Sequence, residues 1–205
     1  KEDASKEIIV LFFFGLFGYN IFKMINHISN FLHAFTKPKN ILLAFLINMF
    51  FGMFVMPYCK NIIDPNNLIQ VLDLKITGYT TEDVYTIFDI IGEQGRKYYL
   101  LIESIIDSVY PLTYMILYGL LFSFLLSLVT SSKSNLWKLN VLPLLAGAFD
   151  YLENINIITL LLNYPKQLPT LVWISSTCSI LKWLAILLCL IVALICLLVW
   201  LGRKL

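Results

Sequence analysis

Residues 139–165 constrain the fold more than any other part of the chain. The stretch is apolar over a length that suits a membrane-crossing helix, yet its middle carries Asp150, Glu153, Asn154 and Asn156. Ionisable side chains inside a bilayer are costly, so they normally face other helices and a polar partner. The sequence therefore predicts a membrane protein in which other helices supply partners for these side chains.

The composition supports this class. Of the 205 residues, 59% are hydrophobic and 14% are charged, and the mean hydropathy is +0.80. Soluble domains carry about a quarter charged residues, and a single soluble core could not cover so much apolar surface. We therefore expect an integral, multi-pass membrane protein. A net charge of +2 without a basic block argues against a nucleic-acid partner.

Four apolar runs after residue 36 are long enough to cross a bilayer. They cover residues 41–59, 98–130, 139–163 and 171–201. Residues 1–36 contain a further apolar and partly amphipathic helix, which either spans the membrane or lies at its interface. The predicted fold is all-α: a four-helix transmembrane bundle over residues 37–205, preceded by the N-terminal helix.

The polar loop over residues 61–97 predicts two local structures. Leu72, Leu74 and Ile76 alternate with polar residues, which favours a short extended segment. Thr80 or Thr81 is a suitable cap for a helix. Over residues 82–91 that helix carries its apolar side chains on one face and ends at Gly92. We expect this short amphipathic helix to lie against the membrane surface.

A basic and aromatic group follows this helix. Arg96 and Lys97 stand beside Tyr99, a combination typical of the headgroup level of a bilayer. Two interpretations remain open: the pair extends to the headgroups beside an aromatic belt, or Arg96 recognises a lipid phosphate.

The predicted helix over residues 98–130 has a polar stripe and a proline. The stripe follows steps of three and four residues and comprises Tyr99, Glu103, Asp107, Tyr110, Tyr114 and Tyr118. Pro111 cannot donate a hydrogen bond to the carbonyl of Asp107. The helix should therefore kink there and leave a free carbonyl beside a carboxylate, which polar neighbours must satisfy.

The buried polar residues of the four predicted spans fall at a similar depth. At a rise of ~1.5 Å per residue, they lie ~14–20 Å from the side that carries the 61–97 loop. We expect Lys182 to pair with Asp107, Asp150 or Glu153. The alternative is that Glu103, Asp107 and Lys182 belong to helix ends outside the lipid. The candidate ligand- or ion-binding residues are Asn48, Glu103, Asp107, Tyr110, Tyr114, Asp150, Glu153, Asn154 and Lys182.

No metal or cofactor is expected. The four cysteines have no metal-ligand spacing and suit small core positions. His27 and His33 are six residues apart and do not share a helix face.

Three segments resemble a family of small polytopic membrane proteins that is itself uncharacterised. They read GYTTEDVYTIFDIIGEQGRKYYL, DSVYPLTY and LPLLAGAFDYLENINIITLLLNYP. The resemblance covers residues 72–165 and implies no activity. It implies that the pattern positions are Gly78, Tyr79, Gly95, Arg96, Tyr99, Asp107, Pro111, Tyr114, Asp150, Glu153 and Asn154. Four spans with acidic groups inside the bundle are also similar to the sterol-isomerase and sigma-2-receptor membrane fold.

Three functions remain open. The bundle binds or passes a small molecule, lipid or ion; or it is an intramembrane enzyme that modifies a lipid with one carboxyl as acid and another as base; or it is a structural subunit that joins a membrane-protein partner or a second copy of itself. An apolar cavity that reaches the carboxylates would favour the first two. A packed ion-pair centre without a cavity would favour the third.

Overall fold

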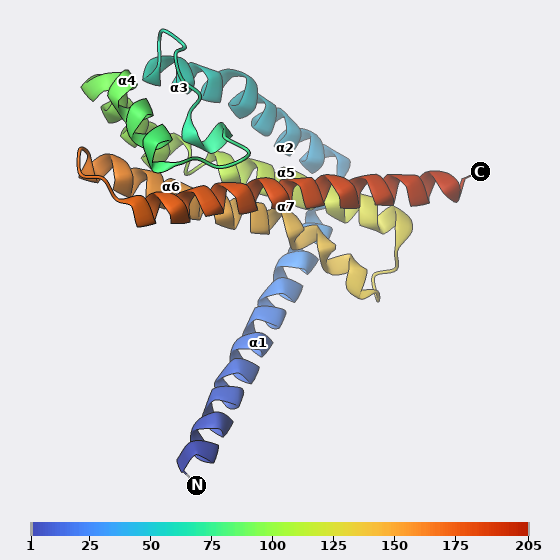
Figure 1. Ribbon diagram of the computed structural model, residues 1–205. Coiled ribbons are helices and arrows are strands. Elements are labelled where there is room, and N and C mark those ends of the chain that lie inside the picture. Colours follow the sequence, from blue (N-terminus) through green and yellow to red (C-terminus); the bar gives the residue numbers. More distant parts are fainter. Residues whose placement is uncertain (1, 205) are drawn as a thin grey trace.

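The described part of the chain is helical and contains no strand. The computed structural model describes residues 2–204, and the side chains of residues 19–204. Short π-helical and 3-10 turns interrupt or join the α-helices (Figure 1). The α-helices are α1 (Glu2–Phe35), α2 (Pro38–Phe50), α3 (Met56–Ile63), α4 (Thr81–Leu101), α5 (Tyr110–Val129), α6 (Leu142–Asn163) and α7 (Pro169–Gly202). The predicted all-α class is confirmed.

Four helical stretches are long and apolar enough to cross a membrane. They are Pro38–Ile63, Thr81–Val129, Asn135–Asn163 and Pro169–Gly202. Each contains one of the predicted spans or nearly all of it. Three include short turns of other geometry, namely η1 (Phe51–Val55), η3 (Ile102–Ile106) and η4 (Asn135–Val141). The expected set of four long apolar helices is therefore confirmed.

Helices α6 and α7 run side by side for much of their length (Figure 1). The buried side of α7 carries small residues, among them Ser175, Ser179 and Cys189. Small side chains let two helix axes approach closely. The one long charged side chain on this side, Lys182, is therefore held within a tight helix pair.

The stretch Thr81–Val129 is interrupted near its middle. After the π-helical turn η3, the amide of Asp107 donates to the carbonyl of Ile102 (2.9 Å), and α5 restarts at Tyr110 with Pro111 in its first turn. Proline has no amide hydrogen, so the carbonyl of Asp107 receives no helical hydrogen bond from it. The interruption predicted from Pro111 is confirmed.

The segment between α3 and α4 is not extended, so that prediction is wrong. Leu72–Leu74 form the 3-10 turn η2. The amide of Leu72 donates to the hydroxyl of Tyr99 (3.2 Å), and the Leu72 side chain is fully buried. No neighbouring strand exists among the described residues, so the ladder that stabilises an extended segment is lacking.

Helix α4 begins as predicted at a threonine cap. Thr80 Oγ1 accepts from the amide of Asp83 (3.2 Å), and Asp83 Oδ2 accepts from the amide of Thr80 (2.8 Å). This reciprocal pair is a capping box. Gly92 has φ +66° and breaks the helix, as predicted, before helical structure resumes.

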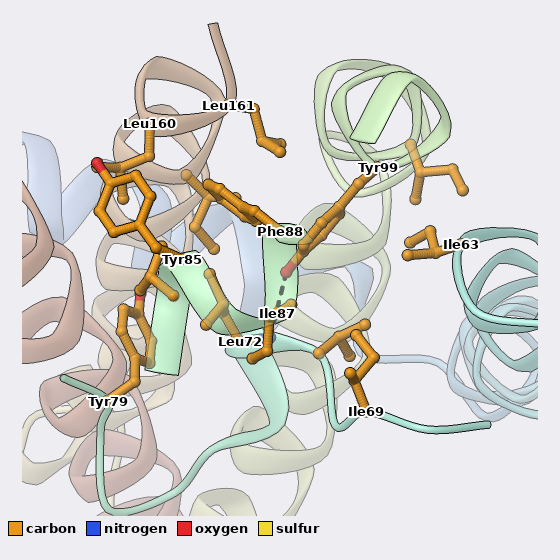
Figure 2. Close-up of a cluster of buried hydrophobic side chains, with 14 of the residues drawn as sticks. Ile63, Ile69, Leu72, Tyr79, Tyr85, Ile87, Phe88, Tyr99, Leu160 and Leu161 are labelled. Atoms are coloured by element: carbon orange, nitrogen blue, oxygen red, sulfur yellow. Dashed lines mark hydrogen bonds between the residues drawn. The ribbon is translucent and has the colours of Figure 1, made fainter. Parts of the chain in front are cut away.

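The apolar face of α4 covers protein, which corrects the expectation that the helix lies on the membrane surface. Val84, Ile87 and Phe88 are buried in one core cluster with Leu160 of α6 and Tyr99 (Figure 2). The hydrophobic periodicity was correctly recognised, but periodicity does not specify which surface an apolar face covers.

Helix α1 joins the bundle through its last turns. The ring of His33 stacks on that of Trp137 in η4 (centroids 3.6 Å apart), and Asn140 Nδ2 donates to the carbonyl of Ser29 (3.0 Å). The earlier turns lead away from the other helices (Figure 1). These contacts give His33 a packing role.

Gly78→Ala should destabilise the protein more than Gly92→Ala. Both glycines have positive φ, +81° and +66°, so each substitution strains the backbone by about 1–3 kcal/mol. A Cβ at Gly78 would also lie 2.5 Å from Ser176 Oγ, whereas none lies within 4 Å at Gly92. We expect a further ~1–3 kcal/mol for this overpacking. The measurement is the free energy of unfolding in detergent micelles, and equal losses would contradict the packing shown here.

Candidate functional site

The ammonium group of Lys182 lies at the centre of the buried polar cluster. Its Nζ is 3.1 Å from Asp150 Oδ1 and 2.8 Å from Glu153 Oε2, and it donates to the backbone carbonyl of Asp73 at 3.2 Å. Lys182 and Asp150 are each 5% exposed and Glu153 is 0% exposed. The contact with Glu153 is an ion pair without hydrogen-bond alignment. The predicted pairing of Lys182 is confirmed, with both acidic residues of α6.

The spacing on α6 explains why one lysine contacts two carboxylates. Asp150 and Glu153 are three residues apart and share a helix face, and Lys182 approaches that face from α7. The ammonium group donates hydrogen bonds to Asp150 Oδ1 and to the carbonyl of Asp73, and its third oxygen contact is the ion pair with Glu153 Oε2. All three oxygen contacts of Lys182 are therefore with protein groups.

Two tyrosines donate hydrogen bonds to these carboxylates. The hydroxyl of Tyr114 donates to Asp150 Oδ2 (2.8 Å), and that of Tyr79 donates to Glu153 Oε1 (3.2 Å) while lying 2.7 Å from Ser175 Oγ. Burial, followed by the charge of Glu153, raises the pKa of Tyr79. Tyr79 therefore remains a hydrogen-bond donor, and each α6 carboxylate has an ammonium and a hydroxyl partner.

Side chains of α6 donate hydrogen bonds to the backbone carbonyls at the helix interruption before Pro111. Asn154 Nδ2 lies 3.1 Å from the free carbonyl of Asp107 and 3.0 Å from its Oδ2, and the hydroxyl of Tyr151 donates to the carbonyl of Ser108 (2.8 Å). This confirms the prediction that polar neighbours donate hydrogen bonds to the freed carbonyl. Asp107 is 4% exposed and has no basic side chain within ion-pair distance in residues 19–204.

Glu103 is the least satisfied acidic residue of the cluster. It lies on η3, is 2% exposed, and its Oε2 has no hydrogen-bond partner among the described residues. Glu103 and Asp107 both line a small cavity of about 30 Å³, together with Lys60, Asp73 and Tyr99. That volume suits one or two water molecules.

Asp73 belongs to the site although the sequence did not single it out. It lies in η2, and its side chain lines both this small cavity and a larger one. Burial raises the pKa of Asp73, an effect that the Lys182 ammonium opposes and the Asp150 charge reinforces. In the sequence, the acidic residue between Leu72 and Leu74 could have indicated this site. The alternation of apolar and polar residues there was interpreted as an extended segment instead.

One side of the polar cluster faces a larger cavity. It has a volume of about 250 Å³. We call it the polar chamber; its lining is Asp73, Leu74, Asp107, Tyr110, Tyr114, Tyr118, Asp150, Lys182, Trp183 and Ile186. Leu74 and Tyr118 are more than one-third exposed, so the chamber opens to the outside beside them.

An apolar cavity adjoins the polar chamber. It measures about 330 Å³, lies between α5, α6 and α7, and shares Tyr114, Tyr118 and Ile186 with the polar chamber. Apart from the two tyrosines its lining is apolar or nearly so, and includes Ala146 and Ala193. We call it the apolar groove. The combination of a few polar groups with a mainly apolar wall is typical of small-molecule sites.

Most of the predicted site residues meet here. Tyr110, Tyr114, Asp107, Asp150 and Lys182 line the polar chamber, and Glu103, Glu153 and Asn154 contact or adjoin those residues. Asn48 does not: its amide donates to Thr113 Oγ1 (3.0 Å) between α2 and α5. Helix α2 packs on α5, but Thr113 lies outside the lining of the polar chamber, so similar depth does not bring Asn48 to the chamber. Tyr79 and Tyr118 extend the predicted set.

The three residues that were expected at the headgroup level of a bilayer lie in different environments. Arg96 Nη1 donates to the carbonyl of Phe88 (2.7 Å), with its guanidinium carbon 3.9 Å from the centroid of the Tyr164 ring. Lys97 pairs with the exposed Glu93. Tyr99 is 1% exposed, so its assignment to the headgroup level is corrected. Its place on the polar stripe of the helix explains the difference, since that stripe faces protein.

The cysteines occupy buried positions, as expected. They are Cys59, Cys178, Cys189 and Cys196, and none forms a disulfide. Among the described residues, no group of histidine, cysteine or acidic side chains has an arrangement that would hold a metal ion.

No protein-family model, curated protein or solved structure matches the chain. The functional inference therefore rests on the chemistry of the polar chamber and the apolar groove.

Lys182→Met should lower the free energy of unfolding by roughly 3–5 kcal/mol, because it leaves two buried carboxylates without their cation. Combining it with Glu153→Gln should recover part of the loss. The control is Lys75→Met, whose ion pair with Asp83 is partly exposed (22% and 38%); a pair of that kind contributes at most about 1 kcal/mol. Unfolding in detergent micelles measures all three. Wild-type stability in Lys182→Met would exclude the ion-pair centre.

Asn154→Leu should cost about 1–3 kcal/mol of unfolding free energy, since the buried Asp107 carbonyl and carboxylate lose their donor. Asn163→Leu on the same helix is the matched control, because its exposed amide donates only to the carbonyl of Thr159. That change should lie within about 0.5 kcal/mol of wild type. Equal losses of unfolding free energy in the two variants would show that Asn154 does not stabilise the interrupted helix.

Proposed function

We propose that this chain is an integral, multi-pass membrane protein that binds a small amphipathic molecule. The observation that carries the proposal is that the two cavities adjoin: the polar chamber, about 250 Å³, shares Tyr114, Tyr118 and Ile186 with the apolar groove, about 330 Å³. The polar group of the ligand would lie in the chamber. Its apolar body would lie in the groove between α5, α6 and α7, where a molecule dissolved in the bilayer has access.

The charge of the cluster limits the polar group of the ligand. Among residues 19–204, the polar chamber, the small cavity and the ion-pair centre together contain five carboxyl groups, those of Asp73, Glu103, Asp107, Asp150 and Glu153, and only the last two pair with the Lys182 ammonium. Lys182 is occupied by protein oxygens, and Asp107 lacks a basic partner within the described residues. The chamber wall therefore presents carboxyl acceptors, tyrosine hydroxyls and the indole N–H of Trp183, which has no hydrogen-bond partner in the described part of the chain. It favours a ligand group that donates hydrogen bonds or carries positive charge, and it disfavours an anion.

One observation favours the enzyme alternative. Asp107 lines the polar chamber without an ion pair in residues 19–204, so it has the position required of a general acid or base acting on a bound lipid. The two α6 carboxylates are less suited to this role because Lys182 and the tyrosines already bind them. The structural-subunit alternative is weakened by the cavity itself, which a purely structural ion-pair centre does not need.

Native mass spectrometry of the protein released from mild detergent tests the binding function. Wild type should retain a co-purifying small molecule. Ala193→Phe should lose it, because Ala193 lines the apolar groove. Leu194→Phe is the control: the neighbouring Leu194 is 55% exposed and lies outside the lining of both cavities.

Asp107→Asn tests the polar end in the same measurement. Replacing the free carboxylate should reduce retention of the molecule by roughly tenfold or more, as expected for loss of a charged hydrogen bond of about 1.5–3 kcal/mol. Undiminished retention in Ala193→Phe, or no bound molecule in wild type, would refute the proposal.

A further inference from the structure

One end of the bundle carries basic residues and no acidic ones. Its six basic residues lie where α2 begins, where α5 ends, before α6 and after α7: Lys37, Lys39, Lys133, Lys138, Arg203 and Lys204. Arg203 Nη1 donates to the carbonyl of Leu128 (3.5 Å), which joins two of these sites. Between residues 19 and 204, acidic residues occur only within 64–107 and at Asp150 and Glu153.

The opposite end is balanced. Outside the buried cluster it has five basic residues, Lys60, Lys75, Arg96, Lys97 and Lys166, and five acidic ones, Asp64, Glu82, Asp83, Asp89 and Glu93. Two ion pairs form there, Lys75 with Asp83 and Lys97 with Glu93. At the basic end no ion pair occurs within residues 19–204.

The basic end has contacts typical of a membrane–water interface. Lys138 Nζ lies 4.0 Å from the ring centroid of Phe22, and Lys204 Nζ lies 4.4 Å from that of Trp200. Aromatic rings and basic side chains gather at the headgroup level of bilayers. Anionic lipids attract such groups, by about 1 kcal/mol for each lysine or arginine near the surface.

An apolar cavity starts at this end. It has a volume of about 430 Å³ and lies between α1, α2 and α5. Its wall includes the exposed side chains of Phe31, Phe35, Leu43, Ile47 and Ile116. Along α2 the wall runs from Asn40 to Ile47, a distance of ~10 Å at 1.5 Å per residue. The cavity is therefore elongated along the helix.

We propose that this cavity holds one acyl chain of an anionic phospholipid whose phosphate is bound by Lys37 and Lys39. Both lysines are exposed and lie within three residues of Asn40, the polar end of the wall. Helix α2 adds to the attraction, since its first turn contains no acidic residue and no side chain caps it. The cavity shares no lining residue with the polar chamber or the apolar groove, so this site is independent of the proposed function.

The test compares bound lipids by native mass spectrometry after release from nanodiscs of equal parts phosphatidylglycerol and phosphatidylcholine. Wild type should retain phosphatidylglycerol preferentially. Lys37→Gln with Lys39→Gln should reduce the ratio of bound phosphatidylglycerol to phosphatidylcholine by about thirtyfold, from about fivefold for each lysine. Lys97→Gln with Lys166→Gln, at the opposite end, should leave the ratio unchanged.

A second variant tests the acyl-chain part. Ile47→Trp fills the cavity at a side chain that is 43% exposed, and should abolish retention of both lipids while unfolding remains at the wild-type temperature. Leu43→Trp serves the same purpose if Ile47→Trp lowers stability. The proposal fails if wild type shows no preference for phosphatidylglycerol, if both lysine pairs have the same effect, or if the filled variants keep the lipid.

Discussion

The rest of the structure depends on the occupied ammonium group of Lys182. It joins three separate parts of the chain: its own helix α7, the two acidic residues of α6, and the turn η2 through the carbonyl of Asp73. A carboxylate buried without a cation is strongly destabilising, so the pairing of α6 with α7 follows from this contact as much as from their small side chains. The same contact places η2 at the wall of the polar chamber.

The site also depends on a proline. Pro111 leaves the carbonyl of Asp107 without a helical donor, and Asn154 supplies one at 3.1 Å. The same amide contacts the Asp107 carboxylate. Asp107 is therefore held in place by a neutral donor, whereas the α6 carboxylates are held by a cation. This difference separates the α6 acidic residues, which stabilise the bundle, from Asp107, whose carboxyl group lines a cavity without a cationic partner in the described chain.

Features that depend on one helix or one pair of helices could be predicted from the sequence. The length of the apolar runs gave the four long helices. Energetic reasoning predicted that Lys182 pairs with one of three acidic residues and that polar neighbours satisfy the carbonyl freed by Pro111. Features that depend on how loops pack could not. Asp73 was missed because three alternating residues do not distinguish a turn from a strand, and the apolar face of α4 was assigned to lipid because periodicity cannot identify the covering surface. Asn48 was misplaced because equal depth does not specify which side of the neighbouring helix α5 a residue contacts.

The order of the partners along the chain has a consequence for biogenesis. Asp150 and Glu153 are synthesised before Lys182, so α6 leaves the ribosome with two acidic residues that lack their cation. Each such residue costs about 2.5–3.5 kcal/mol or more at the centre of a bilayer. In the membrane protein proposed above, helix α6 is therefore poorly suited to enter the bilayer alone, and is expected to enter with α7 as a helical hairpin closed by residues 164–168. The turn η2, made much earlier, gains its contact with Lys182 only after α7 is synthesised. Correct insertion of α6 thus depends on a helix that is translated after it.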